Sequence, residues 1–98
     1  MIDLENYTLV YNITALPNVL FAQTTKALEP LSFDPEKFVI PTQLSGQQLE
    51  IRIGLYDNKG RCIQLASNMV IANTKFVCQS AEYTGLKMIE TLLSQDSD

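Results

Sequence analysis

The residue types that most often carry catalysis or bind metals are sparse in this chain. It contains no histidine, which removes the commonest general base and the commonest metal ligand. Neither a Ser-His-Asp nor a Cys-His arrangement can therefore form. The two cysteines, Cys62 and Cys78, lack the further ligands that a zinc site needs, and the scattered glycines match neither GxxxxGKS/T nor GxGxxG. We expect no bound metal and no cofactor.

Carboxylates are the remaining candidates for chemistry. Acid–base catalysis by carboxylates needs two that converge and a raised pKa on one of them. Nothing in their spacing indicates such convergence, so we interpret them as solvated surface acids and expect a non-catalytic protein. An enzyme that uses these carboxylates or the outward-facing thiol of Cys62 is the alternative. The carboxylates near predicted turns and strands are Asp34, Glu36, Glu50 and Asp57.

Basic residues gather only around one predicted turn, at Arg52, Lys59 and Arg61, with Glu50 and Asp57 among them. The formal charge is −4, and the acidic excess lies at the two chain ends. Binding to phosphates needs several lysines or arginines on one face. We therefore expect no nucleic-acid partner.

Cysteine usage and hydropathy indicate the compartment. Small secreted domains usually carry a denser, even set of cysteines than the two isolated ones here. Residues 1–5 do not begin a basic segment followed by an apolar run, and no apolar stretch approaches the roughly 20 residues that span a bilayer. We expect a cytoplasmic protein with reduced thiols and no membrane contact.

The length and the alternation of apolar residues predict the fold class. With 98 residues, the chain is expected to form one domain over 1–98, ending in a flexible acidic tail at 94–98. The prediction is an α+β fold, in which an antiparallel sheet of three to five strands carries a long C-terminal helix on one face.

The first half of the chain gives one clear element and one ambiguous element. Residues 7–13 alternate as a strand, which places Tyr7, Leu9, Tyr11 and Ile13 on one face. For 18–28 we favour a helix with Pro17 near its first turn, and a strand is the alternative. All four prolines lie between 15 and 46, so long regular elements are not expected there. The run 34–36 resembles the start of a short capped helix.

A hairpin is predicted over 47–65. A three-residue loop that pairs Asp57 with Arg61 would place Gly60 in the left-handed region, with a bulge. In this register the apolar residues face one another, and a shift by one residue would turn them to the polar face. The expected pairs are Leu55 with Ile63 and Ile53 with Leu65. Residues 69–72 are expected to form a short third strand.

A helix is predicted from about Thr74 to Ser94. Its glycine, Gly85, lies near the centre of the apolar stripe, where it would permit close approach to the sheet at a cost of about 1 kcal/mol in helix propensity. The expected core stripe consists of Val77, Cys78, Ala81, Met88, Ile89 and Leu92, broadened by Leu86 and Leu93.

Two aromatic residues, Phe76 and Tyr83, lie nearly opposite this stripe, among Gln79, Ser80, Lys87 and Glu90. Either the proline-rich stretch of the same chain covers them, or they contact a second chain. We expect the second, with a partner-binding surface at Phe76, Gln79, Tyr83 and Lys87. The predicted function is that of a protein-binding module (a small regulator, inhibitor or assembly factor) that binds a protein partner, itself or both as a homodimer or larger oligomer. The alternative is a small-molecule-binding domain with its pocket between helix and sheet.

Overall fold

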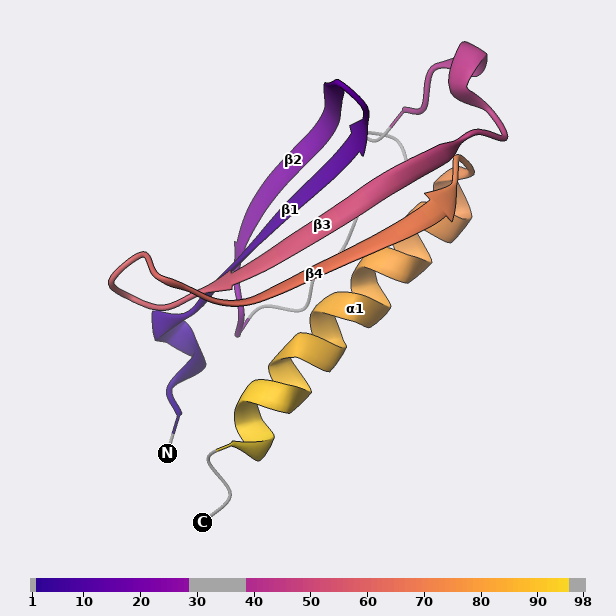
Figure 1. Ribbon diagram of the computed structural model, residues 1–98. Coiled ribbons are helices and arrows are strands. Elements are labelled where there is room, and N and C mark those ends of the chain that lie inside the picture. Colours follow the sequence, from indigo (N-terminus) through magenta and orange to yellow (C-terminus); the bar gives the residue numbers. More distant parts are fainter. Residues whose placement is uncertain (1, 29–38, 96–98) are drawn as a thin grey trace.

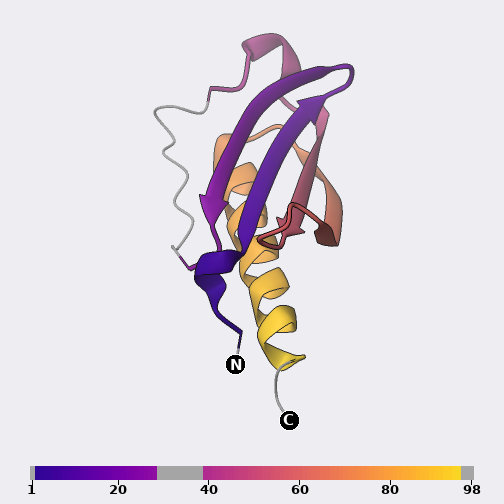
Figure 2. The ribbon, with the colours of Figure 1, turned by 90° about the vertical axis from the view of Figure 1, so that its left-hand side faces the viewer.

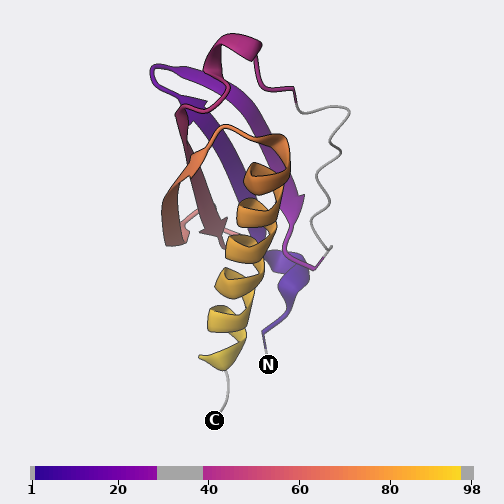
Figure 3. The same cartoon turned by 90° about the vertical axis from the view of Figure 1, so that its right-hand side faces the viewer.

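A four-stranded antiparallel sheet carries one long helix in the computed structural model of this chain (Figure 1), which confirms the predicted α+β class. The structure describes residues 2–28 and 39–95. The strands are arranged in the order β2-β1-β3-β4, and the helix packs on one face of the sheet (Figures 2 and 3). The elements are η1 (Leu4–Asn6), β1 (Thr8–Ala15), β2 (Asn18–Lys26), η2 (Thr42–Leu44), β3 (Gln48–Tyr56), β4 (Cys62–Ile71) and α1 (Thr74–Ser94).

Strand β1 lies inside the sheet between β2 and β3. Its alternation directs Leu9, Tyr11 and Ile13 toward the helix, and all three side chains are buried. The predicted strand and its apolar face are thus confirmed. In register with β1, strand β3 places Leu55 opposite Leu9 and Ile51 opposite Ile13, so two central strands supply most of the core.

The helix favoured for 18–28 is wrong, because this segment forms strand β2. It pairs antiparallel with β1 from Thr8 and Lys26 to Ala15 and Asn18, with a bulge opposite Ile13 and Thr14. Pro17 lies in the turn between the two strands, after a cis peptide bond, and not in a first helical turn. The pairing partner decides the outcome here, since β1 offers a full row of backbone groups that a helix would leave unsatisfied.

The predicted three-residue loop between β3 and β4 is confirmed. The Asp57 amide donates to the Arg61 carbonyl at 3.0 Å, and Gly60 has a φ of 79°. The Asp57 carboxylate accepts from the amides of Lys59 and Arg61 and from the Arg61 Nε. These bonds, chiefly that from the Arg61 amide, lower the pKa of Asp57.

The predicted register beyond this loop is wrong by one residue. An irregularity beside Tyr56 shifts the pairing, so that Leu65 lies opposite Gly54 and Ala66 lies opposite Ile53. Ile63 is the extra residue of the bulge and has no partner on β3, and Leu65 is turned away from the helix. Both side chains are exposed. The expected short strand at 69–72 is also wrong as a separate element, because β4 is continuous to Ile71.

Helix α1 has the predicted bounds. The Asn73 side chain caps its start by accepting from the amides of Lys75 and Phe76. Leu86 and Leu93, which were expected to widen the core stripe, are exposed because they lie on the far side of the helix from Met88. Cys78 and Ile89 are half-buried at the border of the stripe. The buried positions of α1 are Val77, Ala81, Gly85, Met88 and Leu92.

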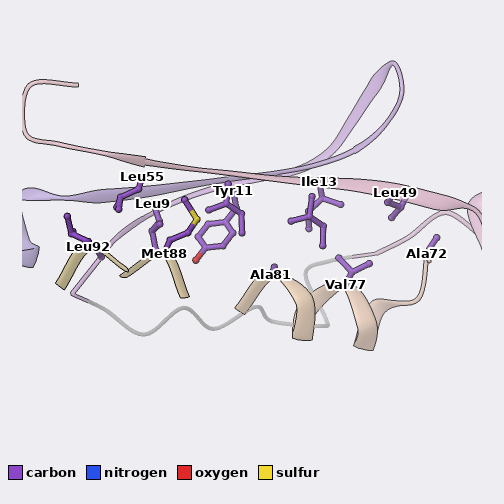
Figure 4. Packing of buried hydrophobic residues seen from close by; sticks show 13 residues of the cluster. Leu9, Tyr11, Ile13, Leu49, Leu55, Ala72, Val77, Ala81, Met88 and Leu92 are labelled. Atoms are coloured by element: carbon purple, nitrogen blue, oxygen red, sulfur yellow. The ribbon is translucent and has the colours of Figure 1, made fainter. Parts of the chain in front are cut away.

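The helix approaches the sheet most closely at Gly85. A methyl group there would overlap the hydroxyl oxygen of the buried Tyr11, so any side chain at this position would force the tyrosine to shift. Small residues, Val77 and Ala81, continue the contact toward the start of α1, and Met88 and Leu92 fill the wider space toward its end (Figure 4). The close approach expected of Gly85 is confirmed.

Two predicted features lie outside the described residues. They are the short helix start at 34–36 and the last three residues of the tail expected at 94–98. Of that tail, Ser94 ends α1 and Gln95 donates its amide to the Leu92 carbonyl, so its first two residues belong to the helix terminus.

We predict that Gly85→Ala lowers the free energy of unfolding by about 1–3 kcal/mol, the usual cost of overfilling a core. In a Tyr11→Phe background the same change should cost less, because the overlapping oxygen is gone and alanine is the better helix former by about 1 kcal/mol. Urea melts of the four proteins complete the cycle. An equal cost of Gly85→Ala in both backgrounds would contradict the close approach described above.

We predict that Gly60→Ala destabilises the protein by about 1–2 kcal/mol, because alanine resists a positive φ. A methyl group at this position would have no heavy atom of another residue within 4 Å, apart from its chain neighbours, so the cost is conformational. Gly60→Asn should cost less, since asparagine tolerates this region. Thermal melts that show both variants to be harmless would overturn the loop conformation.

Candidate functional site

The partner-binding surface predicted from the sequence lies on the outside of α1. We call Phe76, Gln79, Tyr83 and Lys87 the aromatic face. All four side chains are exposed, Phe76 to 53% and Tyr83 to 64% of the full value. The Lys87 ammonium lies 5.7 Å from the centre of the Tyr83 ring and 3.6 Å from the Glu90 carboxylate. Two large rings are thus held in water on the outer side of the helix.

The position of the aromatic face relative to the sheet follows from three consecutive residues. Gly85 packs on Tyr11 of β1, and the Thr84 hydroxyl accepts from the Asn68 amide of β4 at 2.9 Å. Each step back along a helix rotates by 100°, so moving from Gly85 to Thr84 goes from β1 toward β4. A second step of 100° places Tyr83 about 200° from Gly85, so its side chain points away from the sheet. The aromatic face is therefore turned away from the sheet and the core.

A second apolar surface covers the side of β4 that faces away from α1. Sequence reasoning missed it, because the predicted register placed Leu65 in the core. The bulge after Cys62 reverses that assignment. The exposed apolar residues are Leu65 (63%), Met69 (54%) and Ile71 (54%). The apolar spacing of β4 favours the wrong register, since the side that faces α1 carries the small or polar residues Gln64, Ala66 and Asn68.

The candidate carboxylates do not form a catalytic pair in the described part of the chain. Glu50 is near the start of β3, where it accepts from the Ser67 hydroxyl at 3.1 Å and lies 3.6 Å from the Arg52 guanidinium. Asp57 follows the other end of β3 and holds the turn. Asp34 and Glu36 lie outside the described residues. Among the residues described, no group of three or more possible protein ligands could hold a metal ion.

The basic cluster is largely neutralised within the chain. Arg61 pairs with Asp57 at 2.8 Å, and Arg52 pairs with Glu50. A surface whose arginines already face carboxylates offers little to a phosphate backbone. Lys59, at the tip of the loop, is the third member of the cluster and is exposed.

The space between helix and sheet is filled by the core side chains (Figure 4), which weakens the alternative of a ligand pocket there. Two hollows of the described part lie elsewhere. One, of about 310 Å³, lies beside the β1–β2 turn between Leu16 and Met69. The other, of about 270 Å³, lies between Ile40 and the start of α1 at Thr74. In the described ranges, no helix is long and apolar enough to cross a membrane.

The two thiols occupy different surroundings and are not bonded to each other. Cys62 is exposed opposite Tyr56, as its predicted outward position requires, and lies 3.2 Å from the Gln64 carbonyl oxygen. Cys78 is half-buried on α1 against the core. Burial, and secondarily the charge of Glu82, raise the pKa of the Cys78 thiol.

We predict two free thiols that differ in reactivity. Because the thiolate is the reacting form, Cys62 should react with a disulfide reagent at pH 8 roughly tenfold or more faster than Cys78. A Cys62→Ser variant, followed by absorbance, should retain only the slow phase, and Cys78→Ser only the fast phase. If denatured, non-reduced protein contained no titratable thiol, the two cysteines would not be free, and the predicted cytoplasmic location would be wrong as well.

No family model, curated protein or solved structure matches the chain.

Proposed function

We propose that this chain is a non-catalytic protein-binding module, acting as a small regulator, inhibitor or assembly factor, and that it associates with itself. The observation that carries the proposal is the exposure of Phe76 and Tyr83 on the folded domain. An exposed aromatic pair flanked by polar residues is typical of a protein interface. The free thiols support a reducing compartment, and we place the protein in the cytoplasm.

Burial within the chain was the competing explanation for these aromatics. More than half of each side chain remains accessible, so the described residues do not cover them. Leaving them in water forgoes about 1.5–3 kcal/mol of burial for a side chain of this size. A partner that covers Phe76 and Tyr83 would recover this free energy, and the neighbouring Gln79 and Lys87 would form the polar rim.

The surroundings of the site also favour binding over catalysis. The described carboxylates are occupied by turn and cross-strand contacts, at Asp57 and Glu50 respectively. A ligand-binding domain is the second candidate, and the hollow of about 310 Å³ beside the β1–β2 turn is the observation in its favour. We rank it lower because a ligand site is usually a concave apolar pocket with convergent polar groups, and no fully buried core residue lines this hollow.

We predict that the double change Phe76→Ala, Tyr83→Ala weakens self-association by about a thousandfold. Each truncated anchor often costs about 2 kcal/mol or more, and about 1.4 kcal/mol corresponds to a factor of ten. Sedimentation equilibrium gives the dissociation constants, and far-UV circular dichroism should stay unchanged because the buried stripe of α1 is untouched.

The matched control is Val19→Ala, which removes an exposed apolar side chain from the opposite edge strand, β2. This variant should associate as the wild type does. Loss of the fold in the double variant together with a monomeric wild type would show that the aromatics stabilise the domain from within, and the proposed interface would then be wrong.

A further inference from the structure

Strand β4 is an edge strand without the usual protection against pairing. It ends the sheet order, next to α1 (Figure 1), and its ten residues include no charged residue, no proline and no glycine. After the bulge at its start, the register with β3 is regular from Gln64 to Ile71. Natural edge strands usually carry a lysine, a proline or a central bulge, because a long, flat, apolar edge recruits another strand.

The other edge of the sheet differs from β4 in these respects. Strand β2 follows Pro17, contains a bulge at its pairing with Ile13 and Thr14, and ends in the charged Lys26. These features are common devices against edge pairing. The contrast between the two edges singles out β4.

The backbone groups that β4 offers can be identified from one hydrogen bond. The Ala72 amide donates to the Gln47 carbonyl at 2.7 Å, and in an antiparallel ladder such bonded pairs alternate with non-bonded ones. Leu65, Ser67 and Met69 are in the non-bonded pairs with β3, so their amides and carbonyls point away from the sheet. Within the described ranges, no backbone bond crosses this outer edge.

The place of α1 suits a second copy on this edge. The helix contacts β3 and β4, so its axis lies roughly half a strand spacing inside β4. Two β4 strands paired at about 4.8 Å would then bring the two helices to roughly 10 Å, near the 8–10 Å of packed helices. A foreign strand without such a helix would leave this side of α1 in water. The spacing therefore favours a second copy over an unrelated peptide.

We propose that two copies of this chain pair through antiparallel β4 strands about a two-fold axis at Ser67, which joins two four-stranded sheets into one and places the two α1 helices side by side. This inference deepens the proposed function, on which it rests, by naming the partner and the contact. Ser67 lies opposite its own copy, and Leu65 lies opposite the partner's Met69. Outward-facing backbone groups meet in bonded pairs, and the apolar surface of β4 becomes continuous across the axis.

The part of α1 that carries Tyr83 lies beside the centre of β4. Asn68 binds Thr84, so the part of α1 beside Ser67 is the part that carries Tyr83 and Lys87. The contact would extend about 34 Å along β4 and about 20 Å through the two layers, sheet and helix. These dimensions give about 700 Å² of contact per copy. A stable interface of standard size buries about 800 Å² per partner. The paired edge and the helices together thus supply an area of the right order.

Charge at the axis tests the proposal. Ser67→Lys and Ser67→Glu each place two like charges opposite one another in the dimer, so each variant alone should associate at least about a hundredfold more weakly than the wild type. An equimolar mixture of the two variants should associate again, because unlike charges then meet. Sedimentation velocity of each variant, of the mixture and of the wild type measures this. Both introduced charges have a counter-charge nearby in their own chain, at Glu50 and Arg52, so the monomer should stay folded.

The matched controls are Thr24→Lys and Thr24→Glu, at an exposed position of the β2 edge, and they should leave association unchanged. A monomeric wild type, or a mixture that stays monomeric, overturns the β4 pairing. A dimer that resists both Ser67 charges but dissociates on Phe76→Ala, Tyr83→Ala also overturns it, while the proposed protein-binding function stands. Dissociation by the Thr24 variants would move the interface to β2 and overturn the inference equally.

Discussion

The contact between Gly85 of α1 and the ring of Tyr11 sets the distance between the helix and the sheet. Because the helix has no side chain at this point, the Tyr11 side chain can extend from β1 toward the helix until its hydroxyl lies against the helix backbone. Burial, and secondarily the charge of Glu82, raise the pKa of Tyr11 to about 12, so the phenol is neutral in the core. The sizes of the other buried helix residues follow from this close approach. The smaller Ala81 and Val77 lie toward the start of α1, and the larger Met88 and Leu92 lie toward its end.

The lateral position of the helix matters as much as its distance. One hydrogen bond from Asn68 to Thr84 and another from Gln64 to the Met88 carbonyl hold α1 to β4. The helix therefore lies toward the β4 border of the sheet, and its aromatic face points away from the sheet. The β4 edge and the part of α1 that carries Tyr83 lie side by side, which is why we interpret them as parts of a single interface.

Most of the regular structure could be predicted from local patterns. The alternation in β1, the loop at Gly60 and the full length of α1 depend on neighbouring residues and were correct. The aromatic face could be located for the same reason, because an α-helix fixes the angle between residues. Segment 18–28 could not, since its apolar spacing suits a helix and a strand. The second half of the hairpin could not either, because its apolar spacing favours a register that the bulge at Ile63 excludes.

The sequence by itself therefore determined the local elements: a helix with one apolar stripe, two alternating strands and a glycine turn. It also determined that the chain has no histidine for acid–base chemistry or metal binding. Only the tertiary structure decided that residues 18–26 form a strand, because β1 supplied the pairing partner. It also decided that Leu65, Met69 and Ile71 face water. A bulge of one residue reverses every later side chain, so the side of β4 that is buried depends on whether the bulge forms.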